Sequence, residues 1–233
     1  GDTITGGFGM GAGNGGSSTR AILGGGNDGT SSNVIQFFEF ATLGNTQDFG
    51  DLTQARRGSG VVSSCTRAAF GGGRTPGETN IIEYVTIAST GDAVDFGDLT
   101  SGRGSTSGLS NKVRAVAAGG FTDPAVTNTI DFANFETRAN FSDFGDLTVA
   151  LQQAGSFSNQ HGGLQEFQPR APELYSPTGK PFGGGGGVGD IGIMAGGADP
   201  NYNASMTFVQ ISTIGNAQDF GDASGVFGNS AGA

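Results

Sequence analysis

The tetrapeptide Asp-Phe-Gly-Asp occurs four times in this chain of 233 residues, and it constrains the fold more than any other feature. The copies begin at Asp48, Asp95, Asp143 and Asp219, so the first three start 47 and 48 residues apart and the fourth starts 76 residues later. The first three copies continue as Leu-Thr. A period of 47 to 48 residues is typical of propeller blades and other repeat arrays, in which each repeat is one supersecondary unit.

The residues between the copies also repeat. A short apolar segment that begins with arginine precedes each of the first three runs of glycine, and these arginines are Arg20, Arg67 and Arg114, spaced by 47 residues. A segment rich in β-branched and aromatic residues comes next, such as 80–87, and this composition predicts a strand. Gly and Pro interrupt every segment that could have helical periodicity. The sequence therefore predicts an essentially all-β fold.

The repeats are expected to form one domain. We place them at about 1–49, 50–96, 97–144 and 145–220, followed by a closing strand at 221–233, within a single repeat domain over 1–233. The fourth repeat carries an insertion at about 164–187, and its prolines exclude a central strand and indicate an exposed loop.

Each repeat can supply three or four short strands, which predicts a β-propeller of about four blades. Residues 1–3 and 221–223 are partial copies of one motif, so we expect both ends of the chain to complete one sheet and close the ring. One alternative is an open β-solenoid or fibre segment, with repeats stacked along an axis. Another is a structure that partial units from other chains complete.

The repeated motif is expected to mark a turn and a core position. We expect the glycine to adopt positive φ, the aspartates to accept backbone N–H bonds, and the phenylalanines to enter the core. These phenylalanines are Phe49, Phe96, Phe144 and Phe220. Asp-Phe-Gly is also a protein-kinase signature, but four copies without a His-Arg-Asp loop or a helical domain exclude a kinase. The repeated arginines either pair with the motif carboxylates and tie strands or blades together, or lie as solvated charges at an edge.

Charge and cysteine content exclude several classes of protein. The formal net charge of −10 repels phosphate, so no nucleic-acid partner is expected. The chain has no stretch of about 18 apolar residues, so no membrane insertion is expected, and its first residues do not resemble a signal peptide. The single cysteine, Cys65, excludes an intrachain disulfide and a cysteine-ligated metal site within one chain.

Metal and catalytic motifs are weak. Asp92, Asp95 and Asp98 stand three residues apart and offer the carboxylate ligands that Ca²⁺ prefers. Asparagine occupies the position of Asp92 in the other repeats, as Asn45, Asn140 and Asn216. We therefore expect no cofactor, with Ca²⁺ as the alternative. His161 is the only histidine and no Gly-x-Ser-x-Gly motif accompanies it, so a Ser-His-Asp hydrolase is not expected.

The order of these segments resembles kelch repeats of the galactose-oxidase-like propeller type. Residues 66–73, 80–91 and 95–100 are more similar still to the kelch-like repeats of proteins from marine tailed bacteriophages, particularly cyanophages. The resemblance implies a β-propeller and a tail-fibre or other virion structural role, in the virion or outside the cell. Kelch repeats normally carry a tryptophan in the last strand, and the motif phenylalanines are expected to replace it here. Copper chemistry of the galactose-oxidase kind is excluded, because one His and one Cys cannot supply its ligands.

The expected function is therefore non-enzymatic: a multi-copy structural or adhesive protein that contacts other virion proteins or a host-surface glycan. We expect the contacts in residues 6–18 and in the insertion, because loops on a rigid repeat scaffold usually carry variable contacts. Aromatic side chains there can stack on sugar rings or anchor in a partner. The candidate contact residues are Phe167, Arg170, Tyr175, Lys180 and Phe182.

Two other functions are compatible with the sequence. A polysaccharide-degrading enzyme would need carboxylates gathered in one cleft, and Glu166, Glu173 and Asp190 are the only acidic residues outside the repeated positions that could supply them. A secreted bacterial surface propeller is the third interpretation.

Overall fold

The computed structural model describes residues 13–16, 20–42, 44–64, 66–111, 113–158, 191–199 and 201–227. These residues form strands, turns and irregular segments, with no helix among them, so the all-β prediction is confirmed. None of the described segments is therefore a helix that could cross a membrane. The local cause is the alternation of β-branched, aromatic and small residues with glycines that take positive φ, as at Gly72 and Gly73 after one strand.

Most of the described strands assemble into four larger antiparallel sheets, in which neighbouring strands follow one another in the chain apart from the short hairpin strands between the second and the third. Sheet 1 contains β1 (Gly13–Gly16), β2 (Arg20–Gly24), β3 (Ser32–Glu39) and β4 (Gln47–Arg56). Sheet 2 contains β5 (Gly60–Ser63), β6 (Arg67–Gly71), β9 (Ile81–Thr86) and β10 (Val94–Asp98). Sheet 3 contains β11 (Ser107–Ser110), β12 (Arg114–Ala118), β15 (Thr129–Asn134) and β16 (Ser142–Asp146). Sheet 4 contains β17 (Gly155–Ser158), β18 (Ile191–Ala195), β20 (Asn201–Gln210) and β21 (Gln218–Phe227).

Short hairpins lie between the second and third strands of the later sheets. In sheet 2 the hairpin pairs β7 (Arg74–Thr75) with β8 (Gly77–Glu78), and in sheet 3 it pairs β13 (Phe121–Thr122) with β14 (Ala125–Val126). In sheet 4, β19 (Ala198–Asp199) pairs with the start of β20. These hairpins extend the common plan of one repeat, which is a four-stranded antiparallel sheet with a turn of glycines after its second strand.

The structural unit is offset from the repeats expected from the sequence. Each predicted boundary falls inside the fourth strand of a sheet, for example between Phe49 and Gly50 within β4. The segment after Leu-Thr then forms the first strand of the next sheet, as β5 does after Leu52-Thr53. The chain therefore passes from sheet to sheet directly after each Asp-Phe-Gly-Asp motif, which places the motif at the junction between two sheets.

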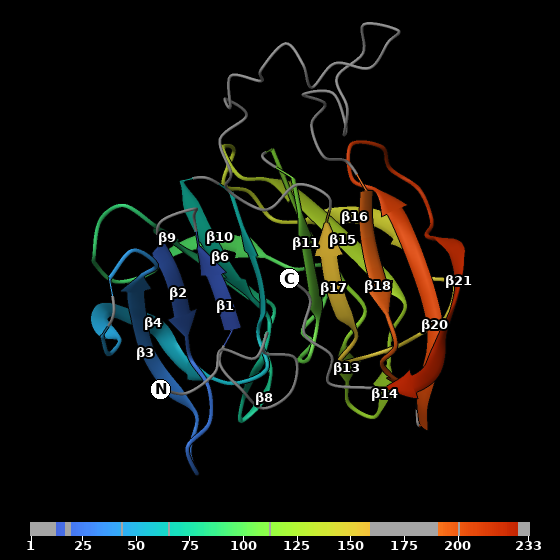
Figure 1. The fold of residues 1–233 in the computed structure, drawn as a ribbon, viewed down its shortest axis with the longest axis horizontal. Helices are drawn as coiled ribbons and strands as arrows, with labels where there is room; N and C mark the ends of the chain where they lie inside the picture. The colour runs from blue at the N-terminus through green and yellow to red at the C-terminus, as the bar shows by residue number, and fades with distance from the viewer. Residues whose placement is uncertain are drawn as a thin grey trace, which may run out of the picture.

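The four sheets lie next to one another in their order along the chain. Figure 1 shows sheet 1 (blue) on the left and sheet 4 (red) on the right, with sheets 2 and 3 between them. The first strands contact one another in order, β1 with β5, β5 with β11 and β11 with β17. Among the described residues, the first strand, β1, belongs to sheet 1 and the last, β21, to sheet 4, so the expected joining of both chain ends in one sheet is not seen. Residues 1–3 lie outside the described ranges.

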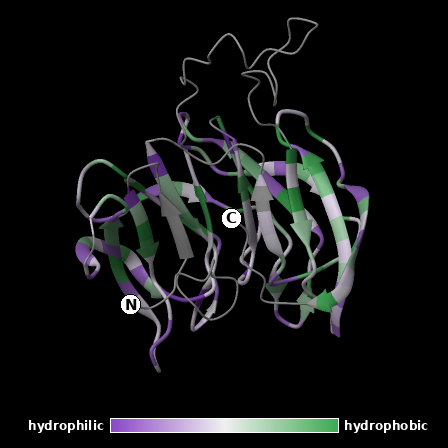
Figure 2. Ribbon diagram, in the orientation of Figure 1, coloured by the Kyte–Doolittle hydropathy of each residue, from purple (hydrophilic) through white to green (hydrophobic). Residues whose placement is uncertain are grey.

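The hydrophobic core consists of layers between successive sheets. One cluster joins sheets 1 and 2 and includes Phe49 and Phe70, a second joins sheets 2 and 3 and includes Phe96 and Phe135, and a third joins sheets 3 and 4 around Phe144. Figure 2 shows hydrophobic residues on the strands of all four sheets, including the two outer sheets of the row. Because both faces of sheets 2 and 3 are covered, neither face of their strands is wholly polar.

Candidate functional site

The Asp-Phe-Gly-Asp motif forms the same β-bulge in all four sheets. The register between the third and fourth strands shifts at the motif phenylalanine, so that this residue has no opposite partner in the ladder. The glycine after it has positive φ in each copy: +146° at Gly50, +141° at Gly97, +144° at Gly145 and +123° at Gly221. A bulge bends the strand and redirects one side chain. In the first three copies it turns the phenylalanine toward the adjacent sheet.

The first aspartate of the motif supports the bulge in two copies. The Oδ1 atoms of Asp143 and Asp219 accept hydrogen bonds from the amides of Gly145 and Gly221, at 3.2 and 3.0 Å. Such a bond from a side chain to the backbone two residues later is a typical turn contact.

Each motif phenylalanine packs edge-to-face on an aromatic ring of the third strand in its own sheet. The ring centroids are 5.8 Å apart for Phe37 and Phe49, 5.9 Å for Tyr84 and Phe96, 5.6 Å for Phe132 and Phe144, and 6.1 Å for Phe208 and Phe220. Phe49, Phe96 and Phe144 are buried between sheets. Phe220 is exposed, because no described sheet comes after sheet 4.

The motif also binds the next sheet through its backbone. The contacts run to the turn before the fourth strand of that sheet, which we call the junction turn (residues 91–93, 139–141 and 215–217, with 44–46 as the equivalent in sheet 1). The amide of Gly91 donates to the carbonyl of Phe49 at 2.7 Å, and the amide of Ala93 donates to the carbonyl of Asp51 at 2.8 Å. The third junction has the same pair of bonds, and the second has the bond from Phe141 to Asp98.

A side chain completes each junction. The amide of the second motif aspartate donates to the Oδ1 atom of an Asp or Asn in the junction turn of the next sheet. The three bonds are Asp51 to Asp92 at 3.0 Å, Asp98 to Asn140 at 3.1 Å and Asp146 to Asn216 at 3.1 Å. Asn and Asp serve equally, because both present the same acceptor oxygen. This position is therefore an inter-sheet bridge.

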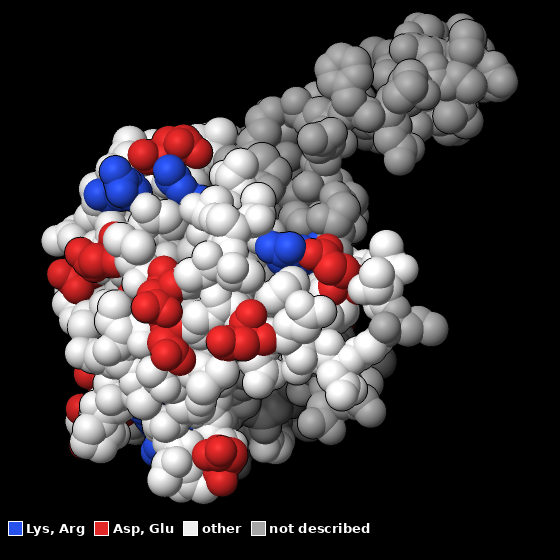
Figure 3. Space-filling view, turned by 90° about the vertical axis from the view of Figure 1, so that its left-hand side faces the viewer, with Lys and Arg blue, Asp and Glu red and all other residues white. Residues whose placement is uncertain are grey.

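The calcium hypothesis is not supported by this geometry. Asp92 is committed to the amide of Asp51, and Asp95 and Asp98 do not join it in a ligand set. Within the described part of the chain, no group of three or more His, Cys, Asp or Glu side chains is arranged to hold a metal ion. The motif aspartates lie at the surface. On the face drawn in Figure 3, acidic groups form separate patches.

The repeated arginines also connect successive sheets. Arg20, Arg67 and Arg114 begin the second strands of sheets 1, 2 and 3. Each guanidinium lies over an aromatic ring of its own sheet and donates a hydrogen bond to a backbone carbonyl of the next sheet. The ring and carbonyl are Phe37 and Ile87 for Arg20, Tyr84 and Phe135 for Arg67, and Phe132 and Ile211 for Arg114. The tie between sheets thus uses carbonyl oxygens rather than the motif carboxylates that the sequence suggested.

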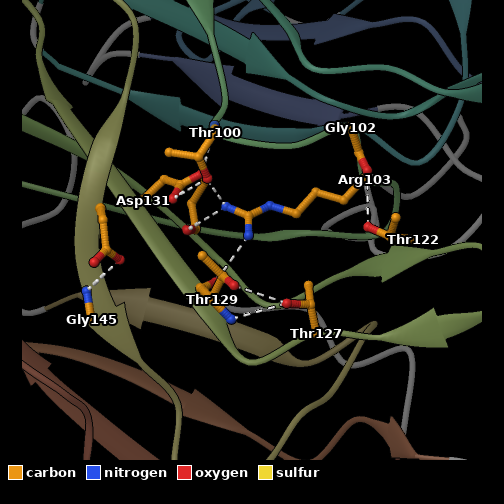
Figure 4. Close-up of polar contacts among 10 residues, drawn as sticks. Thr100, Gly102, Arg103, Thr122, Thr127, Thr129, Asp131 and Gly145 are labelled. Atoms are coloured by element: carbon orange, nitrogen blue, oxygen red, sulfur yellow. Dashed lines mark hydrogen bonds and ion pairs between the residues drawn. The ribbon is translucent and has the colours of Figure 1, made fainter.

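Two further arginines form ion pairs in the interior. Arg56, at the end of β4, pairs with Glu83 in sheet 2, and Arg103 pairs with Asp131 in sheet 3, with 2.6 Å between Nη2 and Oδ2. All four side chains are 0% exposed. Figure 4 shows the Arg103 guanidinium directed at Asp131, with Thr100 on the other side of the carboxylate.

Neighbouring groups form hydrogen bonds with most of the polar atoms of these pairs. The amides of Thr53 and Thr100 donate to Glu83 and Asp131, at 2.6 and 3.1 Å. Arg56 also donates to the carbonyl of Ile81, and Arg103 to that of Thr129. Burial lowers the pKa of both guanidinium groups from their ordinary value, although the facing carboxylates oppose this effect. Arginine keeps its proton nonetheless, so two complete ion pairs cross between sheets.

The third junction has a pair of uncharged residues in the place of this ion pair. Leu151 occupies the place of Arg56 and Arg103. The backbone carbonyl of each of these residues accepts a hydrogen bond from a glycine amide, which is Gly26 for Arg56, Gly73 for Arg103 and Gly120 for Leu151. Thr207 stands where Glu83 and Asp131 stand in the other sheets. Leu151 and Thr207 are both buried. The charges are thus lost together, as expected for two positions that face each other.

These ion pairs were not found from the sequence, although a signal was present. Arg56 and Arg103 are 47 residues apart, and Glu83 and Asp131 are 48 apart, the same period as the motif. A comparison of every charged residue with its counterpart one period later would have selected both pairs.

Several residues singled out in the sequence lie outside the described residues. They are the candidate contact residues Phe167, Arg170, Tyr175, Lys180 and Phe182, the acidic residues Glu166, Glu173 and Asp190, and also His161 and Cys65. The other expected contact segment, 6–18, is described only at 13–16. These four residues form β1 and pair with β2, so this part of the segment is a strand of sheet 1 and not a loop.

An apolar cavity of about 10 Å³ lies between sheets 2 and 3. Its lining includes Val62, Leu99, Val116 and Phe141, with no titratable side chain. A volume of this size holds at most one water molecule, so this cavity is a packing defect and not a substrate site.

Comparison with known proteins assigns no family: no protein-family model matches the chain, and no curated protein matches it.

Proposed function

We propose that this chain is a non-enzymatic structural or adhesive component of a phage-like particle, built as a kelch-like β-propeller scaffold. The observation that supports this proposal is the repeated junction. The same bulge, bridging Asp or Asn and buried phenylalanine, together with at least one backbone bond from the junction turn, join sheets 1 and 2, sheets 2 and 3, and sheets 3 and 4. Residues devoted to such junctions build a rigid support, and a rigid support suits a protein that holds or presents contact surfaces.

The sheet arrangement favours a propeller over a solenoid. Each repeat folds into its own four-stranded antiparallel sheet, and the first strands β1, β5, β11 and β17 contact one another in sequence order. A propeller is built in this way, with the first strands of the blades around a central channel. Repeats of a solenoid also contact their neighbours in order, so the separate four-stranded antiparallel sheet of each repeat is the feature that favours a propeller.

The proposed contacts are with other virion proteins or with host-surface glycan, outside the cell. The described acidic surface and the absence of an extended basic stretch in the sequence argue against nucleic acid as the ligand. The insertion at about 164–187 carries three aromatic and two basic residues, a composition suited to sugar stacking and hydrogen bonding.

The first prediction concerns glycan binding by the chain of 233 residues. Incubated with surface polysaccharides prepared from candidate marine hosts, the protein should bind one of them saturably and release no new reducing ends. The Phe167→Ala/Tyr175→Ala/Phe182→Ala variant should bind it at least about tenfold more weakly, the equivalent of ~1.4 kcal/mol, with an unchanged melting temperature. The exposed Val94→Ala substitution on sheet 2 is the matched control and should bind normally. Release of oligosaccharide would instead indicate an enzyme, and the absence of binding to any preparation would leave the adhesive role without support.

A further inference from the structure

The outer face of sheet 4 carries one half of a junction, with no described sheet packed against it. Phe220 is 55% exposed, whereas Phe49, Phe96 and Phe144 are 3%, 2% and 1% exposed. A Cβ built on Gly50, Gly97 or Gly145 would lie within 2.7 Å of backbone atoms in the next junction turn, but one built on Gly221 would have no atom within 4 Å. The fourth motif thus has the same bulge as the others, but no sheet of the described residues covers it.

The outer face of sheet 1 is the opposite half of such a junction. Phe40 is 59% exposed, although the equivalent Ile87, Phe135 and Ile211 are each buried under the preceding sheet. The junction turn of sheet 1 is also open. Asn45 and Thr46 are exposed, while the residues at the position of Thr46 in the other sheets, Ala93, Phe141 and Ala217, are buried.

The two faces carry the complementary groups that meet in the internal junctions. Asn45 holds the place of Asp92, Asn140 and Asn216, whose Oδ1 atoms accept the amide of the second motif aspartate. The amide left for it is that of Asp222, on the face of sheet 4. Phe40 would cover Phe220 in the way that Ile87 and Phe135 help to cover the motif phenylalanines of the sheets before them.

We propose that the outer face of sheet 4 binds the outer face of sheet 1 of a second copy of this chain, head to tail. The two faces of one chain do not meet, because β4 and β21 lie at opposite ends of the longest axis in Figure 1. A head-to-tail contact uses two different surfaces, and it closes into a ring where the geometry allows. Two copies of four sheets give eight blades, within the usual range of about 4 to 8 for propellers.

The surfaces carry little charge to desolvate. Figure 3 views the molecule from the side of sheet 1 and shows a mostly uncharged surface with separate acidic groups and a few basic groups. On sheet 4, Ile191 stands at the position that Arg20, Arg67 and Arg114 occupy in the other sheets. The contact between copies would therefore be more apolar than the internal junctions and would lack their arginine tie.

This contact deepens the multi-copy assembly of the proposed function, and sedimentation velocity tests it without any glycan. The wild-type chain of 233 residues should sediment as a dimer whose fraction rises with concentration. Phe220→Asp and Phe40→Asp should each be monomeric, because each places a charge in one half of every contact. An equimolar mixture of the two variants should recover a dimer, because the intact sheet 4 of one variant can bind the intact sheet 1 of the other. Val94→Asp, also exposed, is the control that should remain dimeric.

A disulfide trap distinguishes a second copy from closure within one chain. Asn45→Cys and Asp222→Cys are placed together in a Cys65→Ser background, at positions that are hydrogen-bonded neighbours in all three internal junctions. Oxidation should give a covalent dimer, seen without reductant on a denaturing gel. A disulfide formed within one chain would overturn the proposal. So would a wild-type chain that sediments as a monomer at every concentration, or a dimer that persists in both the Phe220→Asp and the Phe40→Asp variants. Each of these results leaves glycan binding to be judged separately.

Discussion

Replacing Arg103 by leucine is expected to lower the free energy of unfolding by about 3–5 kcal/mol, because it leaves a buried carboxylate without its counter-charge. Asp131 is 0% exposed and would keep only its bonds from Thr100. Urea denaturation followed by circular dichroism measures the loss, and the chain has no tryptophan to serve as a fluorescent probe. Arg56→Leu should behave in the same way, since Glu83 is equally buried.

The matched control is the double variant Arg103→Leu/Asp131→Thr. It converts the second junction into the pair found at the third, where Leu151 faces the sheet that carries Thr207. Removing both charges of a buried pair is often neutral or stabilising, so the double variant should recover most of the lost stability. If the single and double variants are equally unstable, the ion pair is not what Arg103 contributes. If Arg103→Leu has no effect, the buried pair does not join these sheets in solution.

Gly97→Ala is expected to destabilise the protein far more than Gly221→Ala, although both glycines occupy the same place in the motif. A side chain at the positive φ of either residue costs about 1–3 kcal/mol. At Gly97 the new Cβ would also lie 2.7 Å from the backbone of Ala139 in the next sheet, which adds about 1–3 kcal/mol of overpacking. At Gly221 nothing lies within 4 Å of that Cβ.

The comparison is read from the urea midpoints of the two variants at a concentration where the chain is monomeric. A difference between them isolates the junction, because the conformational cost is shared. Equal midpoints would mean that the sheets are not in contact at the second motif. Gly221→Ala should instead weaken the dimer, because a second copy would place its junction turn against that residue.

The fold class could be read from the sequence because it depends on local properties. Alternating β-branched and aromatic segments, together with glycines at regular intervals, predict short strands and tight turns. The motif glycine has the positive φ that its sequence context suggests. The offset of the units could not be read in the same way, because the segment after Leu-Thr is equally compatible with closing one sheet or starting the next.

The contacts between sheets were harder to foresee, because they join residues far apart in the chain. In the sequence, Asn45, Asn140 and Asn216 at the position of Asp92 counted against a calcium site, but they gave no sign of a role between sheets, where Asn140 and Asn216 need only an acceptor oxygen. The guanidinium of Arg67 reaches a backbone carbonyl, at Phe135, and a carbonyl leaves no mark in the sequence. Phe220 has the same neighbours in the motif as Phe144, but its exposure depends on whether another sheet packs against sheet 4.

Each Asp-Phe-Gly-Asp motif with a sheet beyond it locks its own sheet to that neighbour, and amide hydrogen exchange is the sharpest test of this lock. The amides of Asp51, Asp98 and Asp146 donate to side chains of the following sheet, so all three should exchange slowly. In the Phe220→Asp variant, which cannot form the contact between copies, the amide of Asp222 should exchange fast and serves as the internal reference. Fast exchange at Asp51, Asp98 and Asp146, at the rate of Asp222, would contradict a locking role for the motif.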